Sequence, residues 1–248
     1  MDTIIKDKFL NLWKKYFKNS ELPITFYYSD NDNGAKEFIK PKGRSCLICE
    51  LAQVRNGKSL CFTANTVACG GGKRYLGFSD ALFPDFKYFL SCGIPGKMEG
   101  ERYVRTPEMV EEIQKNQKKI NAEGNKIIFK RWDNLNENDN PDVVIFFAKP
   151  DVLSGLFTLA NFDQTEPNGT FSPFGAGCGS IVHYPYFEKD SKRPRAVIGM
   201  FDPSARPCVP KDTLTFAVPM VKFLKMIDYM EESFLITETW NNVMKRIE

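Results

Sequence analysis

The same order of short segments occurs twice along this chain of 248 residues. The run "LPITFYYSD" at 22–30 alternates β-branched and aromatic residues as strands do, and "PDVVIFFAK" at 141–149 is a second run of the same kind. Each run precedes a potentially helical segment in which a cysteine closely follows a glycine, "GRSCLICELAQV" from Gly43 and "GAGCGSIVHYPY" from Gly175. A second strand-like run follows each of these segments, so the two parts of the chain share one succession of elements.

The spacing inside the two parts agrees as well. Cys46 and Cys69 are 23 positions apart, and so are Cys178 and Phe201. Two turn-rich loops, "CGGGKR" and "FDPSAR", therefore begin at the same place in each part.

The two parts also end with similar segments. Residues 102–114, "RYVRTPEMVEEIQ", and residues 215–227, "TFAVPMVKFLKMI", each run from a short strand through a proline into a helix. Thr106 before Pro107 is a good helix start, because threonine caps an amide and proline has no amide hydrogen to leave unpaired. We predict a mixed α/β fold in which a strand-helix-strand-loop-strand-helix unit is duplicated into a quasi-two-fold body with mixed sheets. Chance similarity of α/β segments is the alternative.

We expect the two parts to pack together as one domain, since a half with about five elements would leave sheet faces unburied on its own. The polar segment "KRWDNLNENDNP" is the expected connector, because its turn-forming residues interrupt strands. Apolar residues at helical intervals near the start of the chain predict a helix that packs on the core, with a membrane-surface helix as the alternative. The expected boundaries are 1–248 for the domain, 20–122 and 141–231 for the halves, and 2–18 and 232–248 for the terminal helices.

Composition narrows the function classes. No apolar run approaches the roughly 18 residues of a membrane-spanning helix, and the first residues lack the apolar core of a signal peptide, so we expect a cytoplasmic protein without a membrane partner. A formal net charge of +3 is small for this length and disfavours nucleic acid as a partner. Seven cysteines are an odd number, and without an export signal they predict reduced thiols.

Motifs in a fixed order cover roughly residues 20–230. They are the Cys46 segment followed by "LAQVRNGKSL", the loop "ACGGGKRYLGF", the strand "PDVVIFFAKP", "GAGCGS" and "DTLTFAVPMVKFLKMI". In this order the chain resembles the family called domain of unknown function 169, also labelled the uncharacterised ArCR family. The resemblance implies a fold and a site, because it supplies no established reaction. Similar chains often carry a glycine-cysteine pair where this chain has Met200 in "GMFDPS", which implies that half of a symmetric thiol pair is missing here.

The loop at 69–74 is a candidate anion site. Its three glycines free the backbone to take positive φ and to turn amide groups toward one point, and Lys73 and Arg74 supply positive charge. The pattern matches neither a P-loop nor a complete dinucleotide fingerprint. A tight structural turn with two solvated cations is the alternative.

The cysteines offer a second kind of site. Cys46 and Cys49 have the C-x-x-C spacing of thiol redox, zinc and iron–sulfur sites, although their apolar neighbours favour buried structural thiols. If the duplication brings the two glycine-cysteine segments to one cleft, four thiolates become available for a metal: Cys46, Cys49, Cys69 and Cys178. Cys208, which lies in a proline-flanked segment, is not included.

The leading prediction is a protein that binds a small anionic metabolite or cofactor in a cleft between the halves, contacted by loops 69–74 and 201–206. His183, the single histidine, has aromatic neighbours and is interpreted as a pocket or structural residue rather than a catalytic one. A cysteine-ligated metal or iron–sulfur redox protein and an enzyme with a cysteine nucleophile are the alternatives. The sequence identifies no cofactor, reacting bond or oligomeric state. The expected ligand-binding residues are Cys69, Gly70, Gly71, Gly72, Lys73, Arg74, Tyr75, His183, Tyr184 and Arg206.

Overall fold

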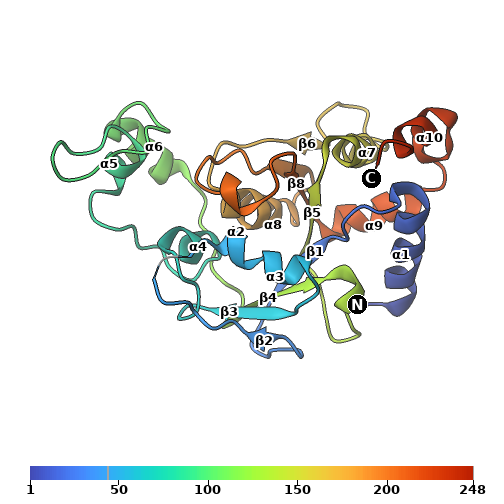
Figure 1. The fold of residues 1–248 in the computed structure, drawn as a ribbon, viewed down its shortest axis with the longest axis horizontal. Coiled ribbons are helices and arrows are strands. Elements are labelled where there is room, and N and C mark those ends of the chain that lie inside the picture. Colours follow the sequence, from blue (N-terminus) through green and yellow to red (C-terminus); the bar gives the residue numbers. More distant parts are fainter. Residues whose placement is uncertain (44, 248) are drawn as a thin grey trace.

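A computed structural model describes residues 1–43 and 45–247. Within these residues, eight strands form one mixed sheet in the order β2-β3-β4-β1-β5-β8-β7-β6 (Figure 1). The predicted mixed α/β class is therefore confirmed. The strands are β1 (Ile24–Ser29), β2 (Lys36–Glu37), β3 (Leu60–Thr63), β4 (Lys126–Arg131), β5 (Val143–Ala148), β6 (Thr170–Phe171), β7 (Ala196–Gly199) and β8 (Leu214–Pro219).

The strand order is the same on both sides of a central pair. β1 and β5 are antiparallel neighbours, and the order read outward from them is β1-β4-β3-β2 on one side and β5-β8-β7-β6 on the other. The pairing directions agree too, since β2 is parallel to β3 and β6 is parallel to β7, whereas the other pairs are antiparallel. A repeated unit produces this order, but strand order alone does not establish a duplication, which stays a prediction.

Helices cover both faces of the sheet. One face is covered by α2, α3, the π-helical turn η2 and α8, and the other by α1, α7 and α9. The helical elements are α1 (Thr3–Phe17), α2 (Leu47–Glu50), α3 (Ala52–Arg55), α4 (Gly70–Tyr75), α5 (Phe86–Leu90), α6 (Pro107–Asn116), η1 (Trp132–Asn134), α7 (Pro150–Ala160), η2 (Gly179–His183), α8 (Tyr184–Glu188), η3 (Arg206–Cys208), α9 (Met220–Tyr229), η4 (Phe234–Ile236) and α10 (Glu238–Met244).

The sequence of β5 reflects its burial on both faces. Val143 and Ile145 belong to the apolar core under α2, α3, η2 and α8, whereas Val144 and Phe146 belong to the core under α1, α7 and α9. A strand that buries both faces reads as a continuous apolar run, here "VVIFFA". The terminal helix α1 packs Phe9 and other aromatic residues onto the second of these cores.

The predicted match between residues 102–114 and 215–227 is wrong in the sheet. The place that corresponds to β8 is held by β4, which begins at Lys126, whereas residues 102–106 contain no strand. α6 does begin at Pro107, and the Thr106 side chain accepts a hydrogen bond from the Met109 amide. With α5, α6 forms a lobe that stands apart from the sheet, at the left of Figure 1. The expected connector begins at Lys130, which lies inside β4. The strand sequence "KIIFKR" places alternate residues on two buried faces of the sheet.

One buried polar cluster lies away from the predicted loops. Lys130 and Asp139 form an ion pair of 2.8 Å with side chains that are 2% and 0% exposed. Both charged groups make further hydrogen bonds. The Tyr27 hydroxyl donates to Asp139, and Lys130 donates to the Asn33 carbonyl at 2.7 Å. Because the partners are satisfied within the protein, we interpret the cluster as structural.

Candidate functional site

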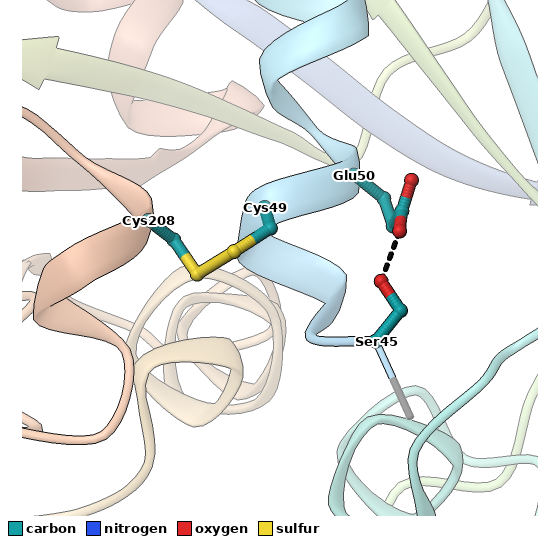
Figure 2. Close-up of a disulfide and its surroundings, with 4 residues drawn as sticks. All are labelled: Ser45, Cys49, Glu50 and Cys208. Carbon is teal, nitrogen blue, oxygen red and sulfur yellow. Dashed lines mark hydrogen bonds between the residues drawn. A yellow bond between two sulfur atoms is a disulfide. The ribbon is translucent and has the colours of Figure 1, made fainter. Parts of the chain in front are cut away.

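A disulfide joins the part of the chain that forms β1–β4 to the part that forms β5–β8, and we call these two parts the halves of the molecule. Cys49, on α2, is bonded to Cys208, on η3, across 159 positions of sequence (Figure 2). The helix that carries Cys49 is anchored by Leu47 and Ile48, which are buried in the core, and its first turn also holds a hydrogen bond from the Ser45 hydroxyl to the Glu50 carboxylate. The prediction that all seven cysteines are reduced is therefore wrong, because folding places a cysteine from a proline-flanked segment beside α2.

The disulfide also breaks the predicted set of metal ligands. Cys49 was one of the four expected thiolates, and its sulfur is covalently bonded to Cys208. Within residues 1–43 and 45–247, no group of three or more histidine, cysteine or carboxylate side chains is placed to hold a metal ion. With Cys49 bonded to Cys208, the four predicted cysteines do not provide four thiolates for a metal site.

The other three of those cysteines lie near one another and form what we call the thiol cluster: Cys46, Cys69 and Cys178. Each is the residue immediately before a helical element, α2, α4 or η2. Burial raises the pKa of the Cys46 thiol, with Cys69 and Asp202 close enough to add to the rise. Burial also raises the pKa of Cys178 well above its ordinary value, with contributions from both other thiols. The Cys46 and Cys178 thiols are therefore protonated at neutral pH.

The three glycines of the predicted anion loop form a helix start instead. They open α4, and the Cys69 sulfur accepts a hydrogen bond of 3.1 Å from the Gly72 amide. None of the three has a positive φ, so the expectation of left-handed backbone there is wrong. Gly72 is needed for a different reason: a Cβ at that position would lie 2.9 Å from the Cys69 sulfur.

Two arginines expected to hold an anion are bonded within the protein. Arg74 donates to the Asp80 carbonyl at 2.7 Å and to the Gln114 side-chain oxygen at 2.9 Å, which ties α4 to α6. Arg206 donates to backbone carbonyls of its own loop, at Met200, Pro210, Lys211 and Thr213. Both guanidinium groups therefore organise loops. Lys73 is partly exposed in the last turn of α4.

His183 lies among aromatic rings, as its neighbours in the sequence indicated. Its ring is edge-on to Tyr75, Tyr184 and Phe187, with centroids 5.0–5.5 Å apart. Burial, and to a lesser degree the positive charge of Arg74, lower the pKa of His183 to about 4. The imidazole is therefore neutral at pH 7. His183 packs against both Tyr75 and Tyr184 in an aromatic group.

A cleft lies beside the second predicted loop, at the carboxyl ends of the parallel strands β6 and β7. We call it the β6–β7 cleft; its volume is about 210 Å³. Two of its lining residues, Phe174 and Phe201, are 69% and 57% exposed. The lining consists of Ser172, Pro173, Phe174, Gly175, Ser180, Gly199, Met200, Phe201 and Asp202.

Polar groups hold the walls of this cleft in place. The Asp202 carboxylate accepts hydrogen bonds from the Gly177 amide at 3.0 Å and from the Ser204 hydroxyl at 2.7 Å, so it links the two loops. Ser180, which is buried, donates to the Gly177 carbonyl at 2.8 Å. The Tyr184 hydroxyl donates to the Phe174 carbonyl at 3.3 Å. The cleft is therefore a formed part of the fold.

Sequence reasoning missed most of this cleft. Phe201 and Asp202 are in a loop that was selected, but Phe174 and Ser180 were not. Met200 in "GMFDPS" takes a φ of +72°, a conformation that is uncommon for a residue with a side chain and that the local sequence does not predict. Exposure of an aromatic ring cannot be read from its local sequence.

These features define a mixed α/β protein with a thiol cluster, a disulfide between its halves and a cleft at one side of its sheet. The chain belongs to the family described as DUF169, uncharacterised ArCR, whose sequence profile matches residues 14–229. No curated protein and no solved structure matches the chain. Among the residues that the structure describes, no helix is long and apolar enough to cross a bilayer.

Proposed function

We propose that the protein binds a small molecule in the β6–β7 cleft. The observation that carries this proposal is the exposure of Phe174 and Phe201, 69% and 57%, on a cleft whose walls are held by hydrogen bonds within the protein. Exposed aromatic rings gathered around a concave surface are typical of binding sites, because a ligand that covers them removes apolar area from water.

The position of the cleft supports the same proposal. In open α/β sheets, ligands commonly bind outside the carboxyl ends of strands, and β6 and β7 run parallel toward this cleft. A volume of about 210 Å³ is below the roughly 300–1,000 Å³ of sites for drug-sized molecules. The ligand, or the part of it that enters the cleft, is therefore small.

The lining favours a ligand without negative charge. Asp202 places a carboxylate on the cleft, and an anion would be repelled by it. Arg74 and Arg206, which the sequence suggested as anion-binding groups, are occupied by protein oxygens. A neutral or cationic molecule with an aromatic ring and hydrogen-bond donors fits the phenylalanines and the carboxylate together. We therefore replace the anionic ligand expected from the sequence with this class.

Three probes of one shape test the proposal: benzamidine, benzyl alcohol and benzoate, which are cationic, neutral and anionic. Ligand-observed saturation-transfer NMR on the full-length protein should show binding of the first two and weaker or no binding of benzoate. Phe201→Ala should weaken the benzamidine signal at least severalfold, because it removes an exposed ring of the cleft. Phe162→Ala is the matched control, since Phe162 is 43% exposed and lies outside the cleft.

Two results would overturn the proposal. One is benzamidine binding that is equally strong in the wild type and in the Phe201→Ala and Phe174→Ala variants. The other is preferential binding of benzoate, which would return the assignment to an anion site.

A further inference from the structure

A free thiol lies beside the disulfide on the same short helix. Cys46 precedes the first residue of α2, and Cys49 is the third residue of that helix. The side chain of a residue before a helix approaches the amide of the third helical residue, which here is the residue that carries the disulfide. The Cys46 thiol makes no capping hydrogen bond, but the nearby amides of Ile48 and Cys49 offset part of the burial effect on its pKa.

We propose that this disulfide is exchangeable, and that Cys46 is the attacking thiol. The Cys46 thiolate forms a bond to the Cys49 sulfur, the bond between Cys49 and Cys208 breaks, and Cys208 leaves as a thiolate. Cys208 then takes up a proton in place of the one that Cys46 released. One disulfide and one thiol are present before and after, so the step requires neither an oxidant nor a reductant.

Position singles out Cys46 among the free cysteines. Cys46 is partly exposed and adjacent to α2, whereas Cys178 is buried and its sulfur is held in the core. The Cys69 sulfur accepts a hydrogen bond from its own helix, at Gly72. Cys61 belongs to a separate small core, and Cys92 lies just after α5 in the lobe.

The exchange would move a crosslink from between the halves to within α2. Before exchange, Cys208 ties the segment that follows Phe201 and Asp202 to the first half of the molecule. After exchange, the bond from Cys46 to Cys49 closes only a four-residue segment, and the 201–208 segment is no longer covalently tied to α2. The two residues of this segment that line the β6–β7 cleft thereby lose a covalent restraint. The exchange itself does not depend on ligand binding in that cleft.

Peptide mapping distinguishes the two disulfides. Cys46 and Cys49 lie in one tryptic peptide, 45–55, whereas Cys208 lies in another, 196–211. The full-length protein with its disulfide intact is incubated with iodoacetamide at pH 7, 8 and 9, quenched with acid, digested and analysed by mass spectrometry. We expect peptide 45–55 with an internal disulfide, together with peptide 196–211 alkylated at Cys208. The initial rate of Cys208 alkylation should rise about tenfold per pH unit, because the thiolate is the nucleophile.

Two variants complete the test. Cys46→Ser should abolish alkylation of Cys208 and leave the two peptides crosslinked, whereas Cys92→Ser should behave as the wild type. Wild-type protein in which Cys46 becomes alkylated while Cys208 stays crosslinked at every pH would overturn the proposal, whether or not the variants fold. A crosslink from either peptide to 59–73, which holds Cys61 and Cys69, or to 132–189, which holds Cys178, would also overturn it, since one of those three cysteines would then be the attacking thiol.

Discussion

His183 shows how the surroundings of one residue set its chemistry. It is buried against Tyr75, Tyr184 and Phe187, and burial lowers its pKa to about 4 from 6.5. A group with this shift is a poor proton carrier at pH 7, because it stays neutral. Its effect is on stability, since the unfolded chain binds the proton more tightly than the folded one.

Stability should therefore depend on this histidine in acid. The contribution of neutral His183 is fully present above pH 6.5 and is lost as pH falls from 6.5 toward 4. Between pH 7 and pH 4.5, the wild type should lose about 2 kcal/mol more unfolding free energy than a His183→Gln variant. Urea unfolding at the two pH values measures this difference. Equal losses of unfolding free energy in the two proteins would mean that His183 is protonated in the folded protein as readily as in the unfolded chain.

Among the secondary-structure elements, helix α4 begins with a run of three glycines. "CGGGKR" has the composition of a flexible turn, but Cys69 caps the first turn and Gly72 is buried under it. Of the three glycines, only Gly72 has close neighbours. A Cβ on Gly71 would meet nothing within 4 Å, whereas one on Gly72 would lie 2.9 Å from the Cys69 sulfur and 3.0 Å from Val67.

Alanine substitutions separate the helix from the turn. Gly71→Ala should raise the unfolding free energy by up to about 1 kcal/mol, because alanine has the higher helix propensity and open space is available. Gly72→Ala should lower it by about 1–3 kcal/mol, because the new methyl group overpacks the site. Chemical denaturation measures both. Destabilisation by Gly71→Ala would indicate positive φ at that position and would restore the loop predicted from the sequence.

At the scale of the whole molecule, two cores on opposite faces of one sheet hold the halves together. Residues from both halves contribute to the core under α2 and η2, and the bond from Cys49 to Cys208 crosses the same face. A crosslink that spans 159 positions removes much of the freedom of the unfolded chain. The disulfide therefore contributes to stability beyond any exchange that it undergoes.

Removing the crosslink should destabilise the whole protein. Cys208→Ser should lower the unfolding free energy by about 2–5 kcal/mol, as expected for a disulfide that closes a long loop. Cys92→Ser is the control and should have little effect, because Cys92 is exposed. Denaturant titrations of the two variants and the wild type under non-reducing conditions provide the comparison. A loss no larger than that of the control would mean that the bond does not constrain the unfolded chain.

Elements with local signals could be predicted before the structure was known. The alternation in "ITFYYS" and the apolar run "VVIFFA" predicted β1 and β5, Thr106 and Pro107 predicted the start of α6, and ordered motifs predicted the family. Each depends on neighbours within a few positions, which set backbone conformation and burial pattern. The succession of segments also agreed with the strand order on either side of β1 and β5, except where β4 takes the place expected of residues 102–106.

The chemistry of the site, in contrast, depends on contacts between distant segments. Cys49 forms a disulfide with a cysteine 159 positions away. The Arg206 guanidinium donates hydrogen bonds to carbonyls of its own loop, and Phe174 and Phe201 are both exposed. Partner choice, hydrogen-bond satisfaction and exposure are properties of contacts between distant segments, so composition and spacing do not specify them. The same residue types that suggested an anion loop and a four-thiolate site therefore became a helix start, a loop anchor and a disulfide.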